Sequence, residues 1–111
     1  MLIEKKEIEN FLIVKPKVAN FDASVSGSFK KQVLGWIKTG KYQVLIDLSE
    51  VHLIDSSGLR AIIVIYKALK RSDSVRLCGA NRHIKNVLEL TGMHNLFQFF
   101  SDETEGLQLV N

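Results

Sequence analysis

Apolar and polar residues alternate with different periods along the chain, and each change of period marks an expected element. Residues 2–8 and 11–18 are predicted to be two short strands. Glu9 and Asn10 between them predict a hairpin turn. Pro16, the only proline, is expected at a strand edge because it cannot donate a hydrogen bond to a sheet.

A helix and a buried strand are expected next. Apolar residues recur at helical spacing from residue 25 to residue 37, with lysines elsewhere around the helix. We expect Asp22 or Ser24 to cap its start and Gly40 to lie near its end. Residues 42–48 are almost continuously apolar, which is typical of a central strand covered on both faces.

A second apolar stretch, residues 51–54, leads into the sequence Asp55-Ser56-Ser57-Gly58-Leu59. We expect a long helix to start near Leu59, because residues 59–69 are apolar almost throughout. Only a thin stripe of this helix is polar, and one valine falls on it. The stripe consists of Arg60, Val64, Lys67 and Arg71.

The remaining third of the chain predicts a strand, a helix, a strand and a final helix. Residues 74–79 form the first strand, and Asn81 is expected to cap a helix closed by Thr91 and Gly92. A short strand is expected over residues 96–100, and residues 101–103 open the terminal helix. The order ββαβαβαβα predicts one α/β layered domain.

Composition and charge limit the class of protein. With 111 residues, 46% of them hydrophobic, the chain can build a single two-layer core. A formal net charge of +3 is too small to indicate nucleic-acid binding, and no basic cluster is interleaved with aromatics. The lone Cys78 is expected to be a small buried hydrophobe, which fits a reducing compartment. No signal-peptide core or 18-residue apolar span occurs, so we expect a cytoplasmic protein without membrane insertion.

The usual motifs for catalysis, cofactors and metals are missing from the sequence. His52, His83 and His94 do not have the spacing of metal ligands. Ser57-Gly58 lacks the preceding glycine of a nucleophile elbow, and no Gly-Lys-Ser/Thr phosphate loop occurs. We therefore expect no catalytic residue, no cofactor and no metal site, and the chain is not expected to be an enzyme.

Asp55, Ser56 and Ser57 place a carboxylate and two hydroxyls where a strand ends and a helix begins. The first N–H groups of a helix lack intrahelical partners and favour anions, so a phosphate on one of these serines would be stabilised there. The simpler alternative is that Asp55 and Ser56 only cap the helix, because both residue types are preferred caps. Both roles can hold at once.

Three segments together resemble the STAS domain, and more narrowly the bacterial anti-anti-sigma factors, also called anti-sigma factor antagonists. They are residues 44–48 (Val-Leu-Ile-Asp-Leu), 53–59 (Leu-Ile-Asp-Ser-Ser-Gly-Leu) and 87–93 (Val-Leu-Glu-Leu-Thr-Gly-Met). The resemblance runs from about Phe11 to the C-terminus. It implies a single STAS-type domain over residues 1–111, an α/β fold with a mixed sheet of four to five strands packed against about four helices.

The resemblance also implies a function. Members of the family bind a serine-kinase anti-sigma factor in a partner-switching pathway and so regulate transcription. The kinase inactivates them by phosphorylating the hydroxyl residue directly after the motif aspartate, and a phosphoserine phosphatase restores them. In this chain that target is Ser56, with Ser57 its neighbour and Asp55 the motif acid. Asp22 aligns with a family aspartate close to the phosphorylated hydroxyl.

The chain departs from the family pattern at three positions. Ala19 stands where relatives usually have glycine, and Arg60 and Val64 stand where many relatives have small residues. Bulk at these last two positions changes the surface offered to a kinase. Taken alone, the charged residues of the stripe over residues 60–71 are better explained by a plain solvated helix face, but Val64, expected to be exposed beside the motif, favours contact. We therefore predict a partner-binding surface. It comprises Asp22, Asp55, Ser57, Gly58, Arg60, Val64 and Lys67.

Two functions are therefore open. The first is a cytoplasmic, phospho-switched antagonist that is a monomer when free and contacts no nucleic acid directly. The alternative is a STAS subunit permanently docked in a larger assembly, such as a lipid-transport ATPase complex. Arg60 and Val64 slightly favour either this class or an atypical kinase partner.

Overall fold

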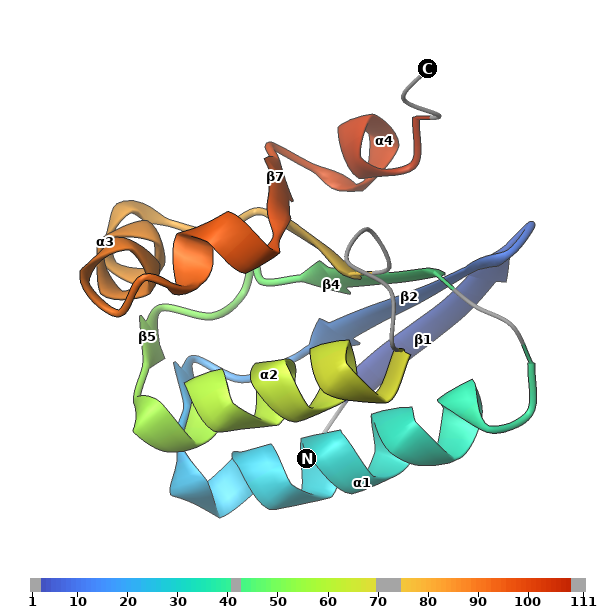
Figure 1. Ribbon diagram of the computed structural model, residues 1–111, viewed down its shortest axis with the longest axis horizontal. Helices are drawn as coiled ribbons and strands as arrows, with labels where there is room; N and C mark the ends of the chain where they lie inside the picture. The colour runs from blue at the N-terminus through green and yellow to red at the C-terminus, as the bar shows by residue number, and fades with distance from the viewer. Residues whose placement is uncertain (1–2, 41–42, 70–74, 109–111) are drawn as a thin grey trace.

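The computed structural model describes residues 3–40, 43–69 and 75–108. Its main element is a five-stranded mixed sheet in the order β1-β2-β4-β6-β7 (Figure 1). Strand β1 (Ile3–Ile8) is antiparallel to β2 (Phe11–Pro16). Strands β4 (Gln43–Asp47), β6 (Val75–Cys78) and β7 (Gln98–Phe100) continue the sheet in parallel with β2. The predicted hairpin, the central strand and the mixed α/β sheet are confirmed.

Helices α1 (Ala23–Ile37) and α2 (Ser56–Leu69) lie side by side and run in the same direction on one face of the sheet (Figure 1). Buried residues of both helices join the inward-facing residues of the strands in one large core. Helix α3 (Arg82–Leu90) completes that core with Ile84 and Leu88. The predicted amphipathic helix and the apolar helix thus form one layer.

The opposite face of the sheet carries a smaller cluster that includes Phe11, Leu45 and Cys78. The short helix α4 (Glu103–Gly106) lies against this face, as Figure 1 shows, and Gly106 packs directly on Leu45. Cys78 is fully buried, which confirms its interpretation as a small core hydrophobe.

A second sheet of two strands was not predicted. Strand β3 (Asn20–Phe21) pairs in parallel with β5 (Leu53–Ile54), with Phe21 opposite Ile54. Two-residue strands have no periodicity of their own, so the hydrophobic pattern cannot reveal them. Because the strands are parallel, α1 and α2, which follow them, start next to one another.

Two predicted boundaries are wrong. Helix α2 starts at Ser56 rather than near Leu59, because Asp55 caps it and allows the first helical turn to include both serines. The last strand starts at Gln98 rather than at residue 96. Gly92 adopts the left-handed conformation, and a 3₁₀ turn, η1 (Met93–Leu96), follows it and occupies the predicted start of the strand. The predicted stripe residue Arg71 lies outside the described residues. Among the helices that the structure describes, none has the length and apolar character needed to cross a membrane.

Candidate functional site

The turn between β5 and α2 is held by the carboxylate of Asp55. Its Oδ1 atom accepts hydrogen bonds from the backbone N–H of Ser57 at 2.8 Å and of Gly58 at 3.1 Å. The carbonyl oxygen of Asp55 accepts the first helical hydrogen bond, from Leu59 N–H at 3.0 Å. The proposed capping role of Asp55 is therefore confirmed, and Ser56 occupies the first helical position after the cap.

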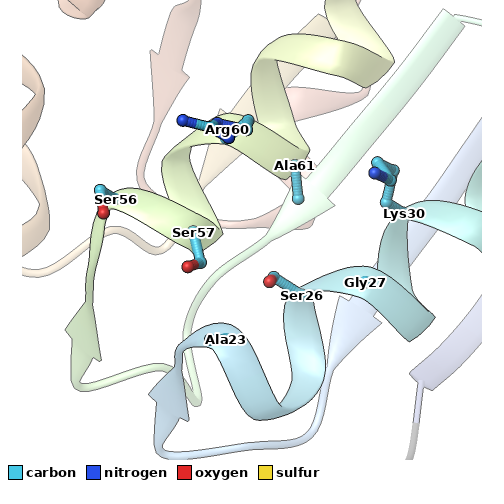
Figure 2. A pocket seen from close by; sticks show the side chains of 8 residues that line it. All are labelled: Ala23, Ser26, Gly27, Lys30, Ser56, Ser57, Arg60 and Ala61. Atoms are coloured by element: carbon cyan, nitrogen blue, oxygen red, sulfur yellow. The ribbon is translucent and has the colours of Figure 1, made fainter.

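The two adjacent serines differ in their exposure. Ser56 is exposed, whereas Ser57 is partly buried. Figure 2 shows the hydroxyl of Ser57 directed toward α1, where Ser26 lies opposite, while the hydroxyl of Ser56 lies at the outer side of the turn. Ser56 is therefore the more accessible hydroxyl for an enzyme.

Asp22 takes the same position before α1 that Asp55 takes before α2. Its side chain accepts hydrogen bonds from the backbone N–H of Ser24 at 3.0 Å and from the Ser24 hydroxyl. These hydrogen bonds from Ser24 lower the pKa of the Asp22 carboxyl, because they stabilise its charged form. Asp22 and Asp55 line one shallow depression together with exposed Leu53 and His83. The structure thus brings the two predicted acids to one surface.

Gly58 is buried, so we assign it a packing role instead of the direct partner contact predicted from the sequence. A Cβ atom at this position would meet backbone and side-chain atoms of β3 and β5. The residue belongs to the site because it allows α2 to start close to β3.

The predicted stripe on α2 is only partly exposed. Arg60 and Lys67 are exposed, but Val64 between them is half-buried rather than exposed as expected. The three residues lie near one another on the helix, because Val64 follows Arg60 by four positions and Lys67 follows Val64 by three. Arg60 is closest to the Asp55 turn, and Lys67 lies two turns further along α2.

The hydrophobic pattern of the chain does not predict that α1 contributes to the site. A cavity of about 320 Å³, which we call the α1–α2 groove, lies between the first turns of the two helices (Figure 2). Ser26 and Lys30 line it from α1, opposite Ser57 and Arg60 from α2. Ser26 could have attracted notice, because it precedes Phe29 by three positions on the buried side of α1. Only the packing of α1 on α2 decides that both residues border this groove.

Among the residues that the structure describes, no group of three or more His, Cys, Asp or Glu side chains could hold a metal ion.

The STAS domain family model matches residues 3–106 of the chain. A Bordetella bronchiseptica protein provisionally named as the anti-sigma factor antagonist BtrV is 29% identical over 62 residues. That alignment covers 55% of this chain and 53% of BtrV, so the match spans about half the length of this relative.

Solved structures have the same fold. A provisionally assigned anti-sigma factor antagonist from Thermotoga maritima superposes with a TM-score of 0.84 at 24% identity, covering 95% of this chain and 91% of that one. The unphosphorylated form of the anti-sigma factor antagonist SpoIIAA superposes with a TM-score of 0.81 at 13% identity, covering 99% and 100%. SpoIIAA from Bacillus in its phosphorylated form superposes with a TM-score of 0.70 at 11% identity. The superposition covers 93% of this chain and 95% of that one.

Proposed function

The chain belongs to the STAS domain family, and from this premise we propose that it is an anti-sigma factor antagonist. In this proposal the unmodified chain binds a serine-kinase anti-sigma factor, phosphorylation of Ser56 ends the binding, and a phosphatase restores it. The chain then acts by binding and release and catalyses no reaction itself. The name of BtrV and the existence of SpoIIAA in phosphorylated and unphosphorylated forms support the proposal.

The observation that carries the proposal is the exposure of Ser56 at the first position of α2. A kinase must reach the hydroxyl oxygen, and the partly buried Ser57 offers less access. The Asp55 carboxylate is already engaged with two backbone N–H groups, so it holds the turn in one conformation. A fixed, exposed serine is what a kinase and a phosphatase can both recognise.

Phosphorylation would act at the interface and leave the fold intact. A phosphoserine carries about −1.5 to −2 charges at neutral pH, and the start of a helix stabilises a negative charge by roughly 0.3–1 kcal/mol when exposed. The phosphate adds bulk and a desolvation cost at the surface that meets the partner, and Asp22 and Asp55 increase the local negative charge. A binding loss of about 3 kcal/mol weakens affinity roughly a hundredfold.

Mass spectrometry after incubation with ATP and an extract of the source cells tests the modification. We expect one phosphate on Ser56 in the unmodified sequence and in Ser57→Ala, and none at this turn in Ser56→Ala. Phosphate on Ser57 would show that the target residue is wrong. A chain that binds its partner but is never phosphorylated would favour the permanently docked STAS subunit.

A further inference from the structure

The α1–α2 groove has a polar wall on α1, opposite Ser57. Ser26 is only 7% exposed, so it is more than nine-tenths buried. Its hydroxyl forms no hydrogen bond with any other described residue, and Figure 2 shows it directed into the groove toward Ser57. The hydroxyl oxygen itself is still reachable from the groove, since Arg76 Nε is the only fully buried side-chain polar atom without a partner in the described part of the chain. It can therefore donate a hydrogen bond to a ligand that enters the groove.

The charges around the groove favour an anion. Lys30 from α1 and Arg60 from α2 both line it, and neither forms an ion pair within the described part of the chain. The residues that line the groove include no carboxylate. The start of α2 is already capped by the Asp55 carboxylate, so the attraction for an anion comes from the two side-chain cations. Hydroxyl donors and two cations together match the oxygens of a phosphate.

We propose that the α1–α2 groove binds a phosphate group, with Lys30 and Arg60 as the charged contacts and Ser26 and Ser57 as hydroxyl donors. The phosphate group has two possible sources. It can be free inorganic phosphate, or it can be the phosphate carried by Ser56, which also lines the groove. Only the second source rests on the proposed function, so the site can be tested without any kinase.

The test is a titration of the unmodified chain with inorganic phosphate at constant ionic strength, followed by NMR of the backbone amides. We expect saturable shifts centred on Ser26, Ser57 and Arg60. Lys30→Gln and Arg60→Gln should each weaken binding about tenfold, because each removes a charge-assisted contact. Ser26→Ala should weaken binding without loss of fold. Lys31→Gln is the matched control, since it removes the same charge from the exposed neighbour of Lys30.

Three outcomes would overturn the proposed phosphate site. They are the absence of saturable shifts, shifts spread over all basic residues, and a loss of phosphate affinity in Lys31→Gln equal to that in Lys30→Gln. A second titration, on chain phosphorylated at Ser56, separates the two sources. If the modified chain no longer binds inorganic phosphate, its own phosphate occupies the groove. If it binds inorganic phosphate unchanged, the groove serves a free ligand. Failure to phosphorylate Ser56 would refute the proposed switch and leave the first titration unaffected.

Discussion

Gly58 lies so close to Phe21 that a Cβ atom on the glycine would be 2.4 Å from the carbonyl oxygen of Phe21. The same Cβ would be 2.7 Å from Cγ1 of Ile54. A backbone oxygen in a paired strand cannot move aside without disturbing the small sheet. The glycine of the motif therefore allows α2 to begin against β3, and this contact fixes the turn that carries Ser56.

Gly58→Ala should destabilise the chain by about 1–3 kcal/mol, because the added methyl overpacks a close contact. Gly35→Ala is the control, since a Cβ there meets nothing within 4 Å. That change should stabilise α1 by about 0.5–1 kcal/mol through the ordinary preference for alanine in a helix. Urea unfolding followed by circular dichroism measures both. Equal stability of Gly58→Ala and the parent chain would contradict the packing role.

If the proposed function is correct, Ser56→Asp should lose most of its affinity for the proposed anti-sigma partner, because a negative charge and added bulk meet the interface. Ser56→Ala should bind at least as well as the parent chain and escape control by the kinase. Ser57→Asp is a useful comparison, because its side chain faces α1 instead of the outer surface. Isothermal titration calorimetry with the purified partner measures these affinities. Unchanged binding of both Ser56 variants would refute the switch.

Arg60→Glu should weaken partner binding more than Lys67→Glu if the contact surface is centred on the Asp55 turn. Arg60 lies one turn from Ser56, whereas Lys67 lies about three turns along α2. The two substitutions reverse the same charge on exposed positions, so their stabilities should remain similar. Association rates at low and moderate salt measure the electrostatic contribution. Val64→Glu is less informative, since Val64 is half-buried and the change also affects folding.

Cys78 should be unreactive in the folded chain at pH 8. Burial, together with the nearby Asp47 carboxylate, raises the pKa of its thiol from the ordinary 9.0 to about 12. Because the folded pKa is raised, the stabilisation from keeping the thiol neutral is complete below pH 9 and is lost as the pH rises toward 12. Thiol-reagent kinetics in buffer and in denaturant compare the folded and unfolded reactivity. Rapid reaction of the folded chain at pH 8 would contradict this placement.

The local chemistry of the chain was readable from the sequence because it depends on near neighbours. Asp22, Asn81 and Asp102 each cap a helix with a side chain that reaches two or three residues ahead. The apolar periods likewise predict the long helices and the central strands. Asp55 is a helix cap of the same kind, and its capping role was predicted. Only the start of α2 was wrong, since the helix begins at Ser56 and not near Leu59.

The assembly of the site depended on contacts between segments far apart in the chain. Pairing of Phe21 with Ile54 brings the Asp22 and Asp55 turns together, and packing of α1 on α2 places Ser26 opposite Ser57. A two-residue strand or a single serine has no periodic pattern in the sequence. Which residues it contacts therefore depends on how the whole core packs. The sequence by itself determined the long helices, the strands of the large sheet and the motif serine. Only the tertiary structure decided the small sheet and which surfaces lie beside that serine, because both depend on contacts between distant segments.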